Sequence, residues 1–296
     1  MPDKYINPFT DFGFKKLFGE EANKDLLLDF IQALLPDKQT ITTITYLKTE
    51  KLGRSISERK AIFDIYCEND KGEKFIVELQ RAEQEYFKER SIYYATFAIQ
   101  EQAKKGKWDY DWQGVYTIGI MDFEFTKSLH KNVKSHVVLY DKENKTLFSD
   151  KLQFIYLEMS KFDKTIDELE TDYEKWLFIL KNLHLLDEIP SKLRSKAFQK
   201  LFQVAEIAKY NPKERQSYEN SLKYYRDMEN SLDLKYEKGL KKGKEEGLKK
   251  GKEEGLKKGK EDVAKNLINL GIADDLIIEA TKLSLKEIEM LRKEKD

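Results

Sequence analysis

The sequence predicts an α/β fold in which a mixed central sheet is flanked by helices and followed by an all-α C-terminal region. Helical and strand patterns follow the order helix, strands, helix, strands up to about residue 160. Strand signals then vanish, and amphipathic or highly charged helical patterns follow. We therefore expect a sheet-containing domain (1–160), a helical region (161–236), a helical linker (237–262) and a small three-helix tail (263–296).

Two helices are expected at the start of the chain. Thr10 or Asp11 can accept hydrogen bonds from the free amides of a first helical turn, so a helix is expected within 7–18. Apolar residues recur at helical spacing over 24–35, and Pro36 is expected to end this second helix.

Strands and further helices are expected through the rest of the chain. Runs rich in β-branched and aromatic residues predict strands at 41–47, 61–67, 75–80, 115–125, 133–140 and 152–157. Helical spacing of apolar residues predicts helices at 83–105, 165–186, 191–210 and 214–236. Gly106 is expected to end the first of these. This order favours a mixed sheet with helices packed on it.

Composition excludes several classes of protein. The 296 residues include 54 basic and 54 acidic side chains, and the resulting zero net charge excludes a uniformly basic nucleic-acid coat protein. The single cysteine, Cys67, excludes an internal disulfide framework and a cysteine-based zinc site. The chain has no apolar run of about 18 residues and no apolar signal core at its N-terminus. We therefore expect a cytoplasmic protein without a membrane partner.

The turn between the strands at 61–67 and 75–80 sets the register of a hairpin. If residues 70–72 form a three-residue turn with its glycine in the left-handed conformation, Asn69 pairs with Glu73. Counting back from that pair places Asp64 directly opposite Glu78. The Cβ atoms of such a pair lie roughly 4.5–5.5 Å apart.

Two carboxylates at this distance repel each other unless a positive charge lies between them. Mg²⁺ or Mn²⁺, which prefer oxygen ligands, would neutralise the pair. Alternatively, one or both carboxylates form ion pairs on a solvated face with Arg59, Lys60 or Arg81. Strict strand alternation would place Ile62, Asp64 and Tyr66 on one face and Phe63, Ile65 and Cys67 on the other.

A family resemblance rests on these residues and their flanks. Asp64, thirteen intervening residues and then Glu78-Leu79-Gln80 resemble the D…(D/E)-x-K core of the PD-(D/E)XK nuclease superfamily, with Gln80 where lysine is more usual. The flanking segments are similar to the Rpn family, recombination-promoting nucleases also labelled putative transposases. These segments are 7–19, 63–65, 87–94 and 115–123. The resemblance implies a PD-(D/E)XK nuclease-like fold.

The resemblance also implies a reaction and a cofactor. The chain would be a metal-dependent DNA endonuclease that hydrolyses phosphodiester bonds and is associated with recombination or mobile elements. Asp64, Glu78 and the carbonyl oxygen of Leu79 would be the ligands of Mg²⁺ or Mn²⁺. Because the ion activates water, no covalent intermediate with the protein is needed.

Three further positions match functional residues of the family. Gln80 would help to orient the attacking water, Asp11 would complete the acidic site, and Arg90 is a candidate phosphate contact. A glutamine amide can donate a hydrogen bond, but it brings no positive charge to the transition state. Gln80 therefore also supports the alternative of a catalytically degenerate DNA-binding or oligomerising scaffold.

A glycine-rich repeat characterises the C-terminal region. The sequence Gly-Leu-Lys-Lys-Gly-Lys-Glu-Glu begins at Gly239 and Gly247 and almost recurs at Gly255. Each glycine costs a helix about 1 kcal/mol relative to alanine, whereas each Glu–Lys pair returns only about 0.2–0.5 kcal/mol. The repeat is either a solvated linker or an element that joins copies of the chain into a homo-oligomer. The tail resembles a helix-turn-helix unit, and it serves either as a helical cap or in DNA binding.

Overall fold

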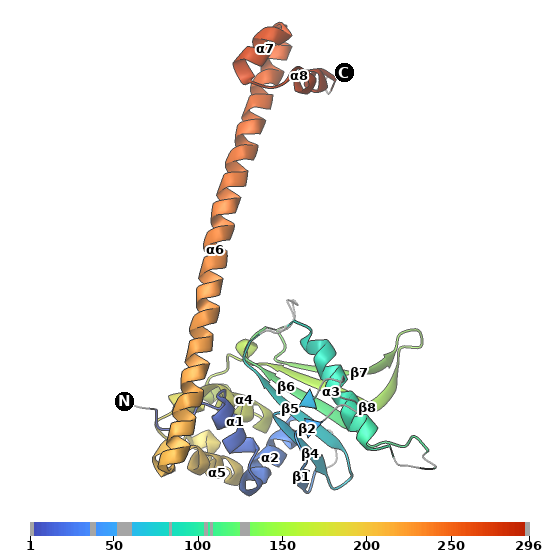
Figure 1. Ribbon diagram of the computed structural model, residues 1–296, viewed down its shortest axis with the longest axis vertical. Coiled ribbons are helices and arrows are strands. Elements are labelled where there is room, and N and C mark those ends of the chain that lie inside the picture. The colour runs from blue at the N-terminus through green and yellow to red at the C-terminus, as the bar shows by residue number, and fades with distance from the viewer. Residues whose placement is uncertain are drawn as a thin grey trace. The chain divides into compact units, whose positions relative to one another are not determined.

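The computed structural model describes residues 3–35, 40–51, 61–82, 85–103, 106, 109–124 and 131–293. The chain forms two compact units, Met1–Tyr225 and Arg226–Asp296. The first unit contains a β-sheet with its flanking helices, and the described part of the second is helical (Figure 1). No helix among the described residues has a stretch long and apolar enough to cross a membrane.

The first unit is built on a six-stranded mixed sheet with the strand order β1-β4-β5-β6-β8-β7. The strands are β1 Ile44–Tyr46, β4 Ile65–Asn69, β5 Lys74–Gln80, β6 Val115–Met121, β7 Lys134–Asp141 and β8 Thr146–Glu158. Strands β5, β6 and β8 run parallel, whereas β1, β4 and β7 are antiparallel to their neighbours. A separate ribbon pairs β2 (Glu50–Lys51) with β3 (Ala61–Ile62). The predicted mixed sheet with flanking helices is therefore confirmed.

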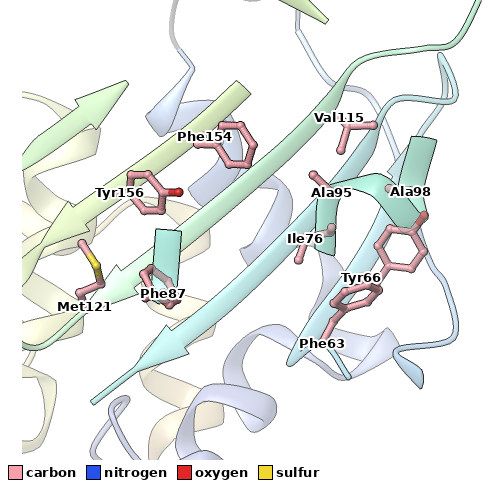
Figure 2. Packing of buried hydrophobic residues seen from close by; sticks show 10 residues of the cluster. All are labelled: Phe63, Tyr66, Ile76, Phe87, Ala95, Ala98, Val115, Met121, Phe154 and Tyr156. Atoms are coloured by element: carbon pink, nitrogen blue, oxygen red, sulfur yellow. The ribbon is translucent and has the colours of Figure 1, made fainter. Parts of the chain in front are cut away.

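The two central strands are buried along their whole length. Every residue of β5 and β6 is buried, as expected for parallel strands covered on both faces. Helix α3 (Phe87–Glu101) packs on one face through Phe87, Ala95 and Ala98. Figure 2 shows these residues over side chains from the sheet, including Ile76 and Tyr156. The Glu78 and Gln80 side chains emerge on this face, because they alternate in phase with Ile76.

A second layer consists of helices that pack on one another around Trp176. They are α1 Asp11–Phe18, α2 Lys24–Leu34, α4 Asp172–Asn182 and α5 Lys196–Ala205. The fully buried Trp176 ring lies 5.7 Å from Phe18, 5.6 Å from Phe30 and 5.1 Å from Phe198 between ring centroids. Residues distant in sequence thus form one aromatic core, which holds α1 against α2, α4 and α5.

The first two helices begin and end close to their predicted bounds. Thr10 caps α1 by accepting a hydrogen bond from the Gly13 amide at 2.9 Å. Helix α2 ends at Leu34, and Pro36 lies outside the described residues. The later helices predicted at 165–186 and 191–210 are shorter than expected. Thr171 and Ser195 cap α4 and α5 respectively, so the preceding residues form only 3₁₀ turns and loops.

The glycine repeat lies inside one continuous helix, α6 (Pro212–Asn269). Residues 212–225 belong to the first unit, where the Phe12 amide donates a hydrogen bond to Ser221 Oγ at 3.1 Å. In the second unit, α7 (Asp274–Thr281) and α8 (Leu285–Lys293) pack against the end of α6. Their core consists of Ala264, Ile268, Ile277, Leu283, Ile288 and Leu291. The end of α6 and the two short helices thus share an apolar core.

Candidate active site

The hairpin of β4 and β5 has the predicted register. Ile65 pairs with Val77, and the ladder continues to the turn in the same register. The Asn69 amide donates a hydrogen bond to the Glu73 carbonyl at 3.1 Å. Gly72 has a φ of +75°, the left-handed conformation that this turn requires. The prediction based on the turn residues is therefore confirmed.

The prediction of one unbroken strand over 61–67 is wrong. Strand β3 ends at Ile62, β4 begins at Ile65, and the chain bends at Asp64. Phe63 consequently packs on the same side as Tyr66, with ring centroids 5.2 Å apart, instead of on the opposite face (Figure 2). The bend buries the Phe63 ring between Tyr66 and Tyr94, which strict alternation would have prevented.

Each of the two carboxylates accepts a hydrogen bond from a backbone amide of the opposite segment. The Asp64 N–H donates a hydrogen bond to Glu78 Oε1 at 3.4 Å. The Leu79 N–H donates to Asp64 Oδ2 at 2.8 Å. The Glu78 side chain is only 6% exposed. The structure thus brings together the two acidic residues that the hairpin register predicts.

The carbonyl group of Leu79 lies on the same side of β5 as Asp64. The Asp122 amide donates to the Gln80 carbonyl at 2.9 Å, so the Gln80 backbone faces β6. In a strand, the N–H and C=O of one residue point to the same side, and successive residues alternate sides. The Leu79 backbone therefore faces away from β6, as its hydrogen bond to Asp64 shows. The oxygen atoms of Leu79 and Asp64 lie on one side of β5.

Nearby positive charges and hydrogen bonds only partly offset the burial and mutual repulsion of the two carboxylates. Burial and the negative charge of Asp64 raise the pKa of Glu78 to about 8, despite the opposing effects of Arg90 and the Gln80 amide. Burial also raises the pKa of Asp64, against the hydrogen bond from Leu79 and the charge of Lys15. Among the described residues, no lysine or arginine forms an ion pair with either carboxylate. Such perturbed carboxylates concentrate at functional sites.

The other residues of the predicted site occupy different positions around this pair. The Gln80 amide lies 3.4 Å from Glu78 Oε2 and is buried with it. The Arg90 guanidinium is near enough to Glu78 to lower the pKa of that carboxyl group, and it also lies over the Phe87 ring. The alternative cation partners Arg59 and Lys60 lie outside the described residues.

Asp11 lies with Asp64 on the wall of an open cavity of about 450 Å³. The cavity is lined by residues of α1 and α6 together with Thr49 and Asp64. Asp11 is 54% exposed and forms an ion pair with Lys15 at 2.9 Å. Within the described parts of the chain, no three His, Cys, Asp or Glu residues are close enough to hold a metal ion together.

Two residues of the site were missed by sequence reasoning. The Tyr94 phenol lies near both carboxylates, which contribute with burial to raising its pKa. Its spacing of four residues from Arg90 puts both on one face of α3, a signal that the sequence did contain. Lys15 shares the cavity with Asp64. Its spacing of four from Asp11 is visible in the sequence, but its approach to β4 depends on how α1 packs.

Comparison with known proteins adds a family. Residues 8–235 match the model of a family described as PD-(D/E)XK nuclease family transposase. The match includes the whole sheet, the acidic pair and α1 to α5. No curated protein and no solved structure shows significant similarity to the chain.

Proposed function

Because the chain belongs to the PD-(D/E)XK nuclease family transposases, we propose that it is a metal-dependent endonuclease that hydrolyses phosphodiester bonds of DNA. The observation that carries the proposal is the contact of Asp64 with Glu78 and Leu79 at the end of β5. We propose recombination or mobile-element transfer as its biological setting and the cytoplasm as its location.

The residues at this site fit a hard divalent cation. The Asp64 and Glu78 carboxylates and the Leu79 carbonyl would hold it, and all three supply the oxygen ligands that Mg²⁺ and Mn²⁺ prefer. The burial and the raised pKa of Glu78 support this assignment, since a bound cation would offset the repulsion between the two carboxylates. A bound cation would supply Lewis-acid activation of water and of the phosphate.

The protein's own side chains would position the reactants. The Gln80 amide, held beside Glu78, would donate to or accept from the attacking water and so fix its direction. Arg90 would contact a phosphate oxygen of the DNA, because its guanidinium already lies close to the acidic pair. Asp11 would complete the acidic wall of the cavity that it shares with Asp64.

Plasmid cleavage tests the proposal. Wild-type protein should nick supercoiled DNA in Mg²⁺ or Mn²⁺ and lose this activity in EDTA. Asp64→Asn and Glu78→Gln should remove it, whereas the control Asp111→Asn, which changes an exposed carboxylate before β6, should not. Equal nicking by all four proteins would indicate a contaminating nuclease and contradict the proposal.

A scaffold function is the second candidate. Two observations favour it: Gln80 replaces the usual lysine, and no group of three ligand side chains occurs among the described residues. Calorimetric titration with Mn²⁺ separates the candidates, because a scaffold should show no binding that depends on Asp64. Deletion of 238–296 should lower the oligomeric mass if the tail joins copies of the chain, and leave it unchanged if the repeat is a linker.

A further inference from the structure

Strand β5 brings no positive charge to the acidic pair, because Gln80 stands where lysine is more usual. Negative charge develops on the phosphate oxygens as water attacks, and fixed cations close to those oxygens stabilise the transition state. Gln80, the residue beside Glu78, is a buried neutral amide. We therefore asked which cation of the described residues lies where a phosphate would meet Asp64.

Lys15 occupies that place. It lies on α1 and lines the same cavity as Asp64. Its side chain is 51% exposed, so an incoming phosphate can reach the ammonium group. Its ion-pair partner is Asp11, 2.9 Å away and also exposed. Exposed pairs of this kind contribute only about 0–1 kcal/mol, so a phosphate can compete for the lysine.

The other cations near the site have different surroundings from Lys15. Lys16, the next residue of α1, forms ion pairs with Glu20 at 3.0 Å and Glu214 at 2.8 Å and is largely buried. The Arg81 guanidinium lies over the Tyr224 ring, 5.9 Å from its centroid. Arg90 lies over the Phe87 ring and does not line the cavity that Lys15 shares with Asp64.

We propose that Lys15 is a catalytic residue whose ammonium group contacts a non-bridging oxygen of the scissile phosphate. It supplies from α1 the charge that is absent at Gln80. The oxygen of water forms a bond to phosphorus, the ester bond to the leaving oxygen breaks, and one proton of the water ends on that oxygen. Lys15 stays protonated throughout. The inference rests on the proposed nuclease function.

The test compares Lys15→Met with Lys24→Met. Lys24 is a matched control, because it is a helical lysine of similar exposure (46%) that pairs with a neighbouring glutamate, Glu21. Lys15→Met should lower the kcat of plasmid nicking by roughly 100-fold, the effect of removing one transition-state contact, with KM and Tm nearly unchanged. Lys24→Met should stay within about twofold of wild type.

Two further variants separate a catalytic charge from a structural role. Lys15→Arg, which keeps the charge and the helix, should retain at least about tenfold more activity than Lys15→Met, since charge carries most of the effect. Introducing Gln80→Lys into Lys15→Met should restore about tenfold, because the charge returns from β5. A structural role would not be rescued in this way.

The outcomes distinguish a failure of the Lys15 inference from a failure of the nuclease proposal on which it rests. If Glu78→Gln is inactive but Lys15→Met keeps wild-type activity, Lys15 is not catalytic while the nuclease function stands. A double variant with Lys15→Met and Gln80→Lys that is no more active than Lys15→Met alone would also overturn the inference. A wild-type protein without metal-dependent nicking would remove the nuclease proposal, and this inference with it.

Discussion

Two buried glutamates near the carboxyl ends of parallel strands differ in how their charges are compensated. Glu78 lies near the end of β5, and Glu158 is the last residue of β8, which aligns with the end of β5 through β6. Glu158 is 1% exposed and forms an ion pair at 3.0 Å with Lys161, itself largely buried. Glu78 is 6% exposed and forms no ion pair with any described residue. Asp64 is beside it instead.

This difference separates a structural carboxylate from a functional one. A buried charge with a hydrogen-bonded partner completes the fold, and it needs nothing from outside the chain. A buried carboxylate that faces a second carboxylate destabilises the fold unless a proton or a cation arrives. Glu158 therefore belongs to the scaffold, whereas Glu78 has the properties expected of a ligand-binding group.

Glu78→Gln should give the largest effect. We expect metal-dependent nicking to fall by at least about 1000-fold, since a cation ligand and its charge are lost. The unfolding free energy should stay the same or rise at neutral pH, because the neutral amide avoids the repulsion with Asp64. Nicking assays and urea unfolding measure the two quantities. A loss of activity that is fully explained by a loss of stability would show that Glu78 has a structural role, as Glu158 has.

Glu158→Gln should show the opposite pattern. The substitution breaks the buried ion pair with Lys161, and such a change destabilises proteins by about 3–5 kcal/mol. Urea unfolding should show the loss, while activity per folded molecule below the transition should remain near that of wild type. If Glu158→Gln abolished nicking at unchanged stability, Glu158 would be part of the catalytic site and the comparison would fail.

The surroundings of Glu78 could be predicted from the sequence better than those of Glu158. The turn ending at Gly72 fixes the hairpin register by local rules, so the approach of Asp64 to Glu78 could be predicted residue by residue. The compensation of Glu158 could not, because it depends on a short 3₁₀ turn after β8 that brings Lys161 back to the sheet. In a 3₁₀ turn the side chains at i and i+3 align, and no such turn was expected after the strand predicted at 152–157.

Other features of the site depended on tertiary packing. The bend at Asp64 exists because Phe63 is buried against Tyr66 and Tyr94, which lie elsewhere in the sequence. Lys15 lines the cavity on a helix, α1, whose position depends on aromatic packing around Trp176. Neither contact produces a periodic signal in the sequence, so neither could be predicted from residue spacing alone.

The pH dependence of stability should also distinguish the two glutamates. In EDTA, Glu78 binds its proton more tightly in the folded state, with a pKa of about 8, than in the unfolded chain, with a pKa near 4.5. Its protonation therefore stabilises the fold fully below about pH 4.5, and this contribution is lost as the pH rises to about 8. Each pKa unit is worth about 1.4 kcal/mol, so the loss amounts to several kcal/mol.

The measurement is the difference in unfolding free energy between Glu78→Gln and wild type across this range. We expect the variant to gain on the wild type steadily from about pH 5 to pH 8 and the difference to level off above that. Saturating Mg²⁺ should reduce the gain, because a cation bound only to the folded wild type adds stability. A difference that does not vary with pH would show that Glu78 is already compensated, as Glu158 is.

Asp11→Asn should have the smallest effect on stability. Asp11 is exposed and its pair with Lys15 joins neighbouring turns of one helix, so we expect a change below about 0.5 kcal/mol. Because Asp11 shares the cavity with Asp64, activity should nevertheless fall about tenfold, equivalent to about 1.4 kcal/mol of transition-state stabilisation. Urea unfolding and nicking rates of the same samples test both expectations.

The combined outcome would show how far the functional site extends beyond the buried pair. Asp11 is exposed, and solvent stabilises its charge. Its burial therefore does not indicate whether it has a structural or a functional role. Only the separation of activity from stability can do so. If Asp11→Asn leaves nicking unchanged, the acidic site ends at Asp64 and Glu78. If it lowers activity with stability intact, an exposed carboxylate and a buried one act on the same phosphate.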